Sequence, residues 1–431
     1  MSATIALIAH DSQKEALLSF ARQHQPTLAR YRLIATEGTS KLLQDNLNLN
    51  VQAYAPAERG GDIQIGAALL AGMAKAVIVL QEPARQIGPS LAMLLHLCDL
   101  HGIPCATNLS TAGFILAGLA QLQQAHLIFN PVSGQGDYKI DLAVVQEQLG
   151  PHFNLKVHLT TPEQDAQSLA QAAIAAGTDL MIASGGDGTV SAVASALIGT
   201  EIPLGVIPRG TANAFCVALG ISSVVAPIRT ACHLILEGHT RKVDAAKCND
   251  HPMVLLAGIG FEAETVEKAS REFKDQWGML AYVMAGWSQL DEHELFSAEL
   301  LIDGDRYQVD AGAITVANAA PPTSVLAQGM GAVLFDDGLL DVTIVTAETK
   351  LQAVTTVLSA LGASLLRSET NHPNISQLRA SRISITANPP QKVVVDGEIV
   401  GTTPVELTCL PDALTVIVPQ SQVPAQLKGG D

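Results

Sequence analysis

The stretch Ile182–Val193, IASGGDGTVSAV, places three glycines around one aspartate between an apolar run and a run of helical character. A tight turn needs one glycine, or two at most, so the third suggests a backbone that comes close to a ligand. A loop between a strand and a helix offers free N–H groups and the positive end of the helix dipole, which favour an anion such as phosphate. The stretch is neither a Walker A loop nor a dinucleotide GxGxxG motif. Taken alone, it is also compatible with a plain tight turn.

Two further glycine-containing stretches follow apolar runs in the same part of the chain. NPVSG (Asn130–Gly134) comes after AHLIF, and PRGTANAF (Pro208–Phe215) comes after PLGVI. In open α/β sheets, ligands bind outside the carboxyl ends of the strands. The three stretches are therefore predicted to line one crevice.

Short apolar runs alternate with helical patterns over the first half of the chain, which predicts parallel sheets covered by helices. The pattern restarts near residue 123, and after about residue 243 it changes to short alternating runs joined by Asp-Gly turns, typical of antiparallel β structure. The predicted fold class is α/β, with an α/β domain over 1–122, an α/β nucleotide-binding domain over 123–243 and a β-rich, sandwich-like domain over 244–431. Helical periodicity returns in the last part at Glu262–Gln289 and Leu351–Leu366.

Composition and charge restrict the partners. The 431 residues carry a formal net charge of −16 and no block rich in Lys or Arg. Nucleic acid is therefore not an expected partner, because neutralising its phosphates needs clustered cations. The same charge opposes binding to anionic lipid surfaces.

Location is predicted from three absences in the sequence. No apolar stretch reaches the ~18 residues that span a bilayer, and MSATIALIAHD predicts a first strand rather than a signal peptide. The six cysteines show no CxxC pair and no disulfide spacing. A cytoplasmic location is expected.

NPVSG, GGDGT and PRGTAN, in this order and at this spacing, resemble the catalytic domain of diacylglycerol kinases and sphingosine kinases, and most of all the bacterial lipid kinases. The resemblance covers roughly Ala125–Pro419. NAD kinases and phosphofructokinases share GGDGT, but the companion motifs favour a lipid kinase, and no NAD-kinase-like NE…NNAD pattern is present. The resemblance implies an ATP- and Mg²⁺-dependent kinase that transfers the γ-phosphate to a diacylglycerol-like lipid hydroxyl.

The resemblance also implies a nucleotide site, in which the GGDGT residues hold the ATP phosphates and their magnesium. The predicted nucleotide-binding residues are Asn130, Thr160, Gly185, Gly186, Asp187, Gly188, Thr189 and Thr211. Two positions depart from the family pattern: Ser191 stands where Asn is usual, and Ala214 stands where Asp is usual. Either change is expected to alter nucleotide affinity or substrate preference.

Two acidic turns lie further along the chain. VVVDGEIV predicts a β-hairpin with Asp396-Gly397 at its tip, and the resemblance makes Glu398 the general base that takes the proton of the lipid hydroxyl. LFDDGLLDV is, on the simpler interpretation, a turn with solvated acids. The resemblance places a structural Mg²⁺ there, held by the side chain of Asp337 and the carbonyls of Leu334 and Leu339.

The first domain has a resemblance of its own. IALIAHDSQK, ATEGTS, RGGDIQIGA and IPCATNLSTAGF resemble methylglyoxal synthase along residues 1 to about 120. That enzyme removes a proton from dihydroxyacetone phosphate and expels phosphate. The resemblance makes Asp62 the catalytic carboxylate, and a lysine and hydroxyls at strand ends suit a phosphate. The positions that match its first loop and phosphate cradle are His10, Asp11, Lys14, Thr39 and Ser40.

This domain also departs from its family. Pro89 and Ala92 stand where a catalytic-site His and Asp are expected, Glu82-Pro83 replaces part of WDP, and Pro56-Ala57 replaces a phosphate-contacting Ser-Gly. Loss of the His removes the imidazole expected to assist the carbonyl oxygen. A non-catalytic domain that binds a small phosphorylated metabolite is therefore favoured over a working synthase.

The sequence thus predicts a lipid kinase that attaches peripherally and transiently to a membrane surface to reach its substrate. Two alternatives remain. One is a bifunctional protein that also makes methylglyoxal and phosphate from dihydroxyacetone phosphate. The other is a non-catalytic protein that senses phosphorylated metabolites with both parts.

Overall fold

The structure is a computed structural model that describes residues 3–71, 73–82, 86–221, 225–260, 295–320, 333–346 and 375–422. The chain forms two compact units: Met1–Leu127 with Leu142–His158 and Gly177–Asp179, and Ile128–Asp141 with Leu159–Ala176 and Leu180–Asp431. The predicted domain limits at 122/123 and 243/244 stay predictions. The helices predicted at Glu262–Gln289 and Leu351–Leu366 lie outside the described residues.

A five-stranded parallel sheet organises the N-terminal part, in the order β3-β2-β1-β4-β5. Its strands are β1 (Ala3–Ala9), β2 (Arg32–Thr36), β3 (Val51–Tyr54), β4 (Met73–Leu80) and β5 (Cys105–Ala106). The helices are α1 (Lys14–Gln23), α2 (Gln25–Leu28), α3 (Glu37–Leu47), α4 (Gly61–Leu70), α5 (Pro89–Leu100) and α6 (Leu109–Ala120).

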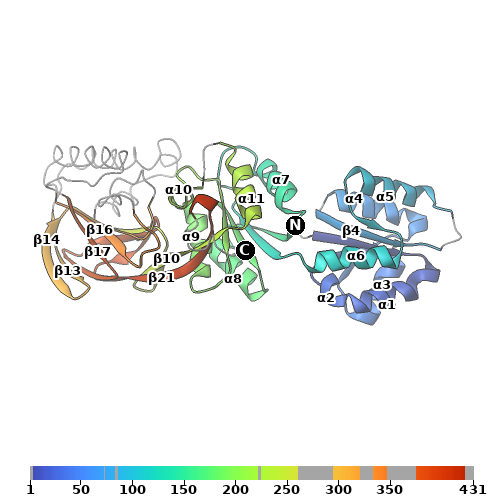
Figure 1. Cartoon of the computed structure of the whole chain (residues 1–431), viewed down its shortest axis with the longest axis horizontal. Helices are drawn as coiled ribbons and strands as arrows, with labels where there is room; N and C mark the ends of the chain where they lie inside the picture. The colour runs from blue at the N-terminus through green and yellow to red at the C-terminus, as the bar shows by residue number, and fades with distance from the viewer. Residues whose placement is uncertain are drawn as a thin grey trace. The chain divides into compact units, whose positions relative to one another are not determined.

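Helices cover both faces of this sheet, as its unbroken apolar strands require. Figure 1 shows α4 and α5 on one face and α1, α3 and α6 on the other. Each face has its own core: Ile65 of α4 and Leu94 of α5 are buried on the first, and Leu17 of α1, Leu43 of α3 and Leu116 of α6 on the second. The predicted α/β domain is confirmed, although the short strand β3 was not among the predicted elements.

The middle of the chain continues the βα alternation. Its strands are β6 (Gln124–Phe129), β7 (Asn154–Leu159), β8 (Leu180–Gly185) and β9 (Leu204–Pro208). The helices are α7 (Tyr138–Leu149), α8 (Ala166–Ala175), α9 (Asp187–Leu197), α10 (Ala214–Ala218) and α11 (Pro227–Glu237). These strands end a longer sheet with the order β14-β13-β18-β21-β9-β8-β6-β7.

The C-terminal part is β-rich, as predicted. Its strands are β10 (Thr240–Cys248), β11 (His251–Met253), β12 (Leu256–Gly260), β13 (Phe296–Ile302), β14 (Asp305–Ala311), β15 (Ala313–Ala317), β16 (Leu340–Val345), β17 (Ile375–Ala380), β18 (Arg382–Asn388), β19 (Lys392–Val395), β20 (Glu398–Thr402) and β21 (Val405–Ile417).

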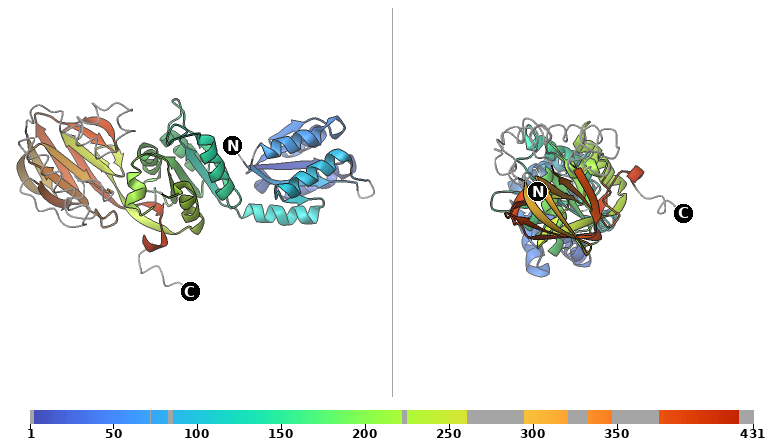
Figure 2. Two further views of the ribbon diagram at one scale, coloured as in Figure 1. Left: turned by 90° about the horizontal axis from the view of Figure 1, so that it is seen from above. Right: turned by 90° about the vertical axis from the view of Figure 1, so that its left-hand side faces the viewer.

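A six-stranded antiparallel sheet, β17-β16-β15-β12-β19-β20, shares one apolar core with β13, β18 and β21 of the longer sheet. Figure 2 shows these strands from two further sides. The run SAELLIDGDRYQV forms the two strands of a hairpin, β13 and β14, around Asp303-Gly304. The VVVDGEIV hairpin forms β19 and β20 of the six-stranded sheet. There β12 pairs antiparallel with β15 and β19, which lie far from it in the sequence.

Candidate functional site

Close packing explains Gly185 of the GGDG loop, between β8 and α9, and Gly210 of the PRGTAN loop. A Cβ added at Gly185 would lie 2.6 Å from the Thr189 hydroxyl oxygen, and one added at Gly210 would lie 2.6 Å from the Cα of Gly186. The GGDG and PRGTAN loops therefore touch backbone to backbone. A Cβ at Gly188 would meet no atom of the described residues within 4 Å. Packing does not require that third glycine, which stands exposed in the first turn of α9.

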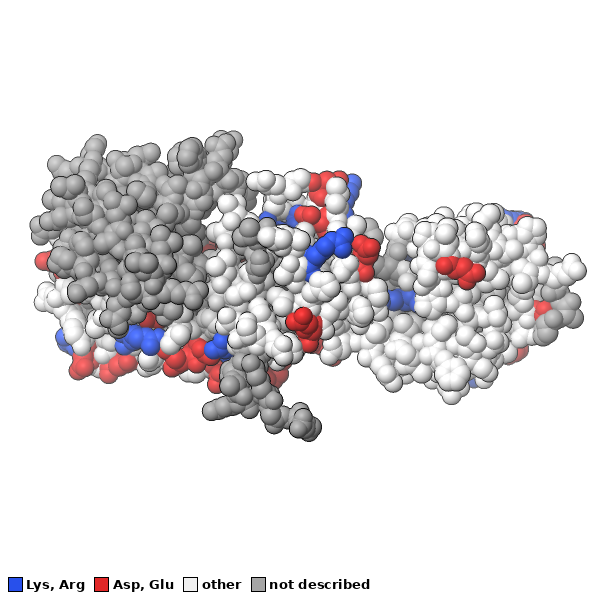
Figure 3. Space-filling view, turned by 45° about the horizontal axis from the view of Figure 1, so that its top comes forward, with Lys and Arg blue, Asp and Glu red and all other residues white. Residues whose placement is uncertain are grey.

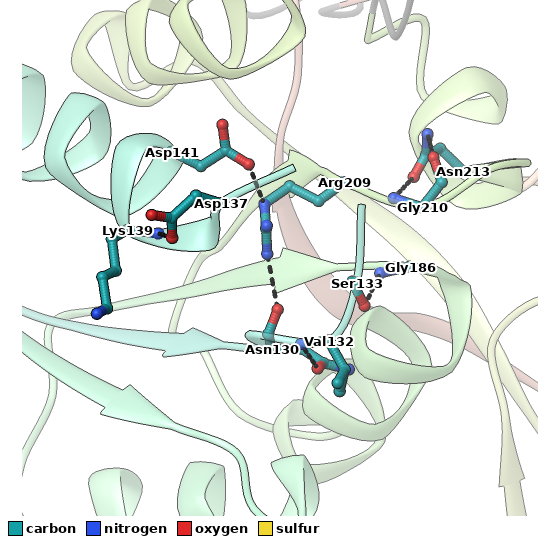
Figure 4. A network of polar contacts seen from close by, with 10 residues as sticks. All are labelled: Asn130, Val132, Ser133, Asp137, Lys139, Asp141, Gly186, Arg209, Gly210 and Asn213. Carbon is teal, nitrogen blue, oxygen red and sulfur yellow. Dashed lines mark hydrogen bonds and ion pairs between the residues drawn. The ribbon is translucent and has the colours of Figure 1, made fainter. Parts of the chain in front are cut away.

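The NPVSG loop is tied to the GGDG loop by side chains. The Asn130 amide donates from Nδ2 to Thr189 Oγ1 at 2.9 Å, and the Asn130 N–H donates to the carbonyl of Ser184 at 2.9 Å. The Gly186 N–H donates to Ser133 Oγ at 3.3 Å. Two of the three predicted loops thus meet at the carboxyl end of β8, and Figure 4 shows the Ser133 contact.

Arg209 lies in the PRGTAN loop and contacts the NPVSG loop, and it was not among the predicted site residues. It is buried, and its Nε donates to Asp141 Oδ2 at 2.9 Å while Nη1 donates to the Asn130 carbonyl at 2.7 Å (Figure 4). Its guanidinium also lies 4.3 Å from the centroid of the Phe129 ring. A buried arginine stays charged and needs such partners. The signal was visible in the sequence as the arginine of PRGTAN.

The PRGTAN turn closes on itself. Asn213 adopts a left-handed conformation with φ of 49°, which asparagine tolerates. Its Oδ1 accepts from the Gly210 N–H and its Nδ2 donates to the Gly210 carbonyl, both at 2.8 Å. Thr211 is therefore presented on an exposed turn after β9, and half-buried Thr160 directly follows β7. Their nucleotide-binding roles stay predictions.

Asp187 is the first residue of α9 and is half-buried. Its Oδ1 accepts from the N–H of Phe215, in the first turn of α10, at 3.3 Å. Burial raises the pKa of the Asp187 carboxyl, and backbone hydrogen bonds from residues that include Phe215 and Ala214 oppose this rise. The carboxylate is thus fixed beside the phosphate-type loop, where an oxygen donor suits Mg²⁺.

The VVVDGEIV hairpin has the predicted geometry. Asp396 and Gly397 form its tip with φ of 48° and 90°, and Glu398 begins β20 opposite Val395. Glu398 is exposed, as both the general-base hypothesis and the plain hairpin require. Asp396 differs, since its carboxylate accepts from the N–H groups of residues 254–256 at 2.9–3.0 Å.

The LFDDGLLDV turn holds Asp337, the predicted metal-binding side chain, in contacts with the protein itself. The carboxylate of Asp337 accepts from the Leu339 N–H at 3.2 Å and forms an ion pair with Arg379. A cation of the protein itself therefore already neutralises Asp337. Leu334 is exposed on the same turn. The metal-binding roles of the three predicted residues stay predictions.

In the N-terminal part, the residues predicted to hold phosphate follow β1 and β2. The Lys14 ammonium lies 2.7 Å from where a Cβ of Gly38 would stand, so it covers the start of α3, and it also pairs with Asp11 at 2.5 Å. Thr39 and Ser40 are buried in the same helix turn, and Ser40 Oγ donates to the carbonyl of Val51 at 2.9 Å. A cation and a helix N-terminus thus lie together, as phosphate binding needs.

His10 lies at the end of β1. Its Nδ1 contacts Ser12 Oγ at 2.9 Å, and its Nε2 lies 3.9 Å from a carboxylate oxygen of Glu82, which is exposed after β4. Glu82 is one of the residues that depart from the methylglyoxal synthase pattern. The structure therefore places a carboxylate beside the imidazole at this edge of the sheet.

Asp62 is buried at the start of α4, with 4% of its surface exposed. Its Oδ2 accepts from Ser90 Oγ at 3.1 Å, and its Oδ1 has no hydrogen-bond partner among the described residues. Burial raises the pKa of this carboxyl, the Ser90 bond lowers it, and the charge of Glu58 raises it. Pro89 begins α5 and Ala92 is exposed on it, so neither supplies an acid or base. The hydrogen bond from Ser90 to Asp62 was not predicted from the sequence motifs.

Three family models match the chain. The diacylglycerol kinase catalytic domain matches residues 124–248, the YegS C-terminal NAD kinase beta sandwich-like domain matches residues 256–418, and the MGS-like domain matches residues 16–107. The three matches follow one another along the chain in the predicted order. They confirm the predicted combination of an MGS-like α/β domain, a kinase-type α/β domain and a β-rich domain.

Individual relatives agree with these matches. A diacylglycerol kinase of Bacillus subtilis is 29% identical over 308 residues, 70% of this chain and 98% of the relative. A methylglyoxal synthase of Ralstonia nicotianae is 44% identical over 121 residues, 28% of this chain and 90% of the relative. An uncharacterized protein of Synechocystis sp. is 46% identical over 432 residues, 97% of this chain and 99% of the relative.

One solved structure supports the kinase-type part. A crystal structure of a diacylglycerol kinase from Bacillus anthracis str. Sterne has a TM-score of 0.57 and 27% sequence identity, and the match covers 70% of this chain and 99% of that one. Within the described ranges, no helix combines the length and apolarity that a membrane span requires.

Proposed function

Because this chain belongs to the diacylglycerol kinase catalytic-domain family and also carries a methylglyoxal synthase-like domain, we propose that it is an ATP-dependent lipid kinase. It would transfer the γ-phosphate to the hydroxyl of a diacylglycerol-like lipid. The observation that carries the proposal is the contact of the GGDG and PRGTAN loops at Gly186 and Gly210, next to a glycine at 188 that packing does not require.

The nucleotide would lie at the start of α9. The backbone N–H groups of Gly186–Thr189 and the helix dipole suit the phosphates, and the fixed Asp187 carboxylate suits the accompanying Mg²⁺. When bound, ATP supplies the phosphoryl group. The ties of Asn130 and Arg209 keep the loops in place, which lowers the cost of ordering them when the substrates bind.

Glu398 is proposed as the general base. An exposed carboxylate at the start of β20 can accept the proton of a lipid hydroxyl while that oxygen attacks phosphorus. Asp396, two residues earlier, is a poor substitute, because its carboxylate already accepts three backbone N–H groups. We therefore propose Glu398, and not Asp396, as the base.

The lipid would be reached by peripheral, transient attachment to a membrane surface. On the face shown in Figure 3, the Lys and Arg side chains are few and mostly lie beside Asp or Glu. With a net charge of −16, attraction to anionic headgroups is not expected to drive attachment. All six cysteines are free thiols, which suits the reducing cytoplasm proposed as the location.

The N-terminal domain is proposed to bind a small phosphorylated metabolite without turnover. Lys14 and the start of α3 would receive the phosphate, and the unpartnered Oδ1 of Asp62 could accept a hydrogen bond from a ligand hydroxyl. The retained, buried Asp62 carboxyl also supports a second candidate, an active methylglyoxal synthase. Pro89 and Ala92 weigh against it.

Label transfer tests the proposed kinase. The purified protein is incubated with γ-³²P-labelled ATP, Mg²⁺ and detergent-dispersed diacylglycerol or sphingoid base, and the lipids are extracted and counted. Label in the diacylglycerol fraction that disappears in the Asp187→Asn variant is expected. Label in neither lipid, from a protein that binds ATP, would contradict the proposed substrate class.

A further inference from the structure

We propose that Asp396 is a positioning residue that fixes the Glu398 hairpin to residues 254–256, a segment that packs in one core with the nucleotide helix α9. The inference rests on the proposed function, because Glu398 is the base only in that account. The Asp396 carboxylate would keep the VVVDGEIV hairpin in register with the segment that packs against the helix of GGDGTVS.

Asp396 is an unusual residue for a hairpin tip. Its backbone has a φ of 48°, as an Asp-Gly turn requires, but its side chain turns inward. The Oδ2 atom accepts from the Val254 N–H at 2.9 Å, and Oδ1 accepts from the N–H groups of Leu255 and Leu256 at 2.9 and 3.0 Å. The Asp396 N–H in turn donates to the Leu256 carbonyl at 3.0 Å.

Three consecutive backbone N–H groups that converge on one carboxylate form a small anion site within the protein. Charge-assisted bonds of this kind are short and strong compared with neutral ones. Together with the bond from the Asp396 N–H, they join the tip of the β19–β20 hairpin to the start of β12, which is two strand positions from Glu398 in the sheet order.

The segment that holds the Asp396 carboxylate packs against α9. Buried Val254 and Leu255 lie in one apolar core with Val190, Val193 and Ala194 of that helix. Burial raises the pKa of the Asp396 carboxyl, and the backbone hydrogen bonds from this segment oppose the rise. The carboxylate therefore joins the hairpin tip to a segment that is itself packed on the nucleotide helix.

The chain offers a matched control in Asp303. It also begins an Asp-Gly hairpin tip, with φ of 47°, and its carboxylate also accepts backbone N–H groups, from Ser381 and Arg382. It is exposed, however, and α9 is not among its hydrogen-bond partners in the described residues. If substitution of Asp396 lowers activity and substitution of Asp303 does not, the loss comes from the position of Glu398 and not from weakening of a turn in general.

Asp396→Asn and Asp303→Asn are compared in the full-length protein. Asparagine tolerates the left-handed conformation, so both turns form, but the side-chain amide introduced by Asp396→Asn would place N–H donors against the Val254 N–H. Asp396→Asn is expected to lower kcat for lipid phosphorylation by about tenfold or more while the KM for ATP stays within about threefold, and Asp303→Asn is expected to leave both unchanged. Equal kcat values for the two variants would overturn the proposal.

A second measurement does not depend on kinase activity. Hydrogen exchange of the amides over 254–256 and 392–402 is expected to quicken in Asp396→Asn but not in the control Asp303→Asn. Exchange unchanged by Asp396→Asn would overturn the anchoring role. If the wild-type protein phosphorylates no lipid, the proposed function fails, and the exchange comparison still decides whether Asp396 holds the hairpin.

Discussion

The carboxyl edges of two α/β sheets carry the candidate sites, and they differ in how their buried charged groups are paired. At the kinase-type edge, buried Arg209 has partners for its guanidinium, and Asp187 accepts a backbone N–H. At the N-terminal edge, buried Asp62 keeps one carboxyl oxygen without a partner, and the positions expected to hold its acid and base helpers are Pro89 and Ala92.

The difference is one reason to propose phosphoryl transfer at the kinase-type edge and binding without turnover at the N-terminal edge. Groups held by the protein in one arrangement need little reorganisation during a reaction, which is how most of the stabilisation in phosphoryl transfer arises. A buried, unpartnered carboxyl oxygen costs stability unless a ligand supplies a hydrogen bond. This contrast supports the proposal that the N-terminal edge binds a ligand without turnover.

Removal of the Asp187 charge is expected to have the largest effect. Asp187→Asn keeps the shape of the side chain but loses the metal-binding charge, so lipid phosphorylation is expected to fall by roughly 10³-fold or more, as for loss of a key electrostatic group. Asp165→Asn is the control, because Asp165 also accepts a helix-start N–H, from Ser168 at 2.7 Å. The measurement is the initial rate of lipid phosphorylation with labelled ATP. Equal rates for the two variants would show that Asp187 is not part of the active site.

The glycine contact between the loops can be broken selectively. Gly210→Ala places a methyl group 2.6 Å from the Gly186 Cα, so both the Tm and ATP affinity are expected to fall. The methyl group of Gly188→Ala would meet no atom within 4 Å in the part of the chain that the structure describes, so its Tm is expected to stay unchanged while the Kd for ATP rises about tenfold. Calorimetric titration and thermal melts provide the readouts. ATP affinity unchanged in Gly188→Ala would mean that the third glycine has no part in binding.

The N-terminal edge is expected to bind but not to react. Inorganic phosphate should protect the α3 amides from exchange, with the protection lost in Lys14→Ala. Methylglyoxal formation from dihydroxyacetone phosphate should stay below detection, because Asp62 lacks its acid and base partners. A turnover number of roughly 1–1000 per second, as for ordinary enzymes, would show that the protein is bifunctional.

The smallest expected effect is on stability, and it depends on pH. The folded-state pKa of Asp62 is raised, chiefly by burial, so folding favours its protonated form. The stability this gives is fully present below the ordinary carboxyl pKa and is lost as pH rises through the raised folded-state value. Asp62→Asn should therefore raise the Tm at pH 7 but not below about pH 4, relative to the exposed control Asp45→Asn. A lower Tm at pH 7 would show that the carboxylate is well satisfied.

Much of this comparison was predictable from sequence because it depends on local patterns. The alternating apolar runs and the glycine motifs predicted the α/β alternation and the three loops that meet after β6, β8 and β9. Contacts between distant residues were not predictable in this way. The inward turn of Asp396, the pairing of Arg379 with Asp337 and the bond from Ser90 to Asp62 join segments 28 to 142 residues apart.

The two Asp-Gly turns show most clearly which contacts the local sequence does not predict. Asp303-Gly304 and Asp396-Gly397 have the same sequence and nearly the same φ at the aspartate, 47° and 48°. Local sequence predicts a hairpin tip at both. One aspartate is exposed, and the other accepts three N–H groups beside α9, because only the second hairpin pairs with β12. Tertiary pairing, which sequence periodicity does not specify, decides which turn lies beside the candidate site.

The most direct test of a single phosphotransfer site built from GGDGT and DGE is the Glu398→Gln variant. Steady-state lipid phosphorylation is measured under conditions where chemistry limits turnover, with the exposed Glu299→Gln as control. The amide keeps the shape but cannot accept the lipid proton, so kcat is expected to fall by roughly 10²–10⁴-fold with little change in the KM for ATP. A kcat within about threefold of wild type would contradict the assignment of Glu398 as the base.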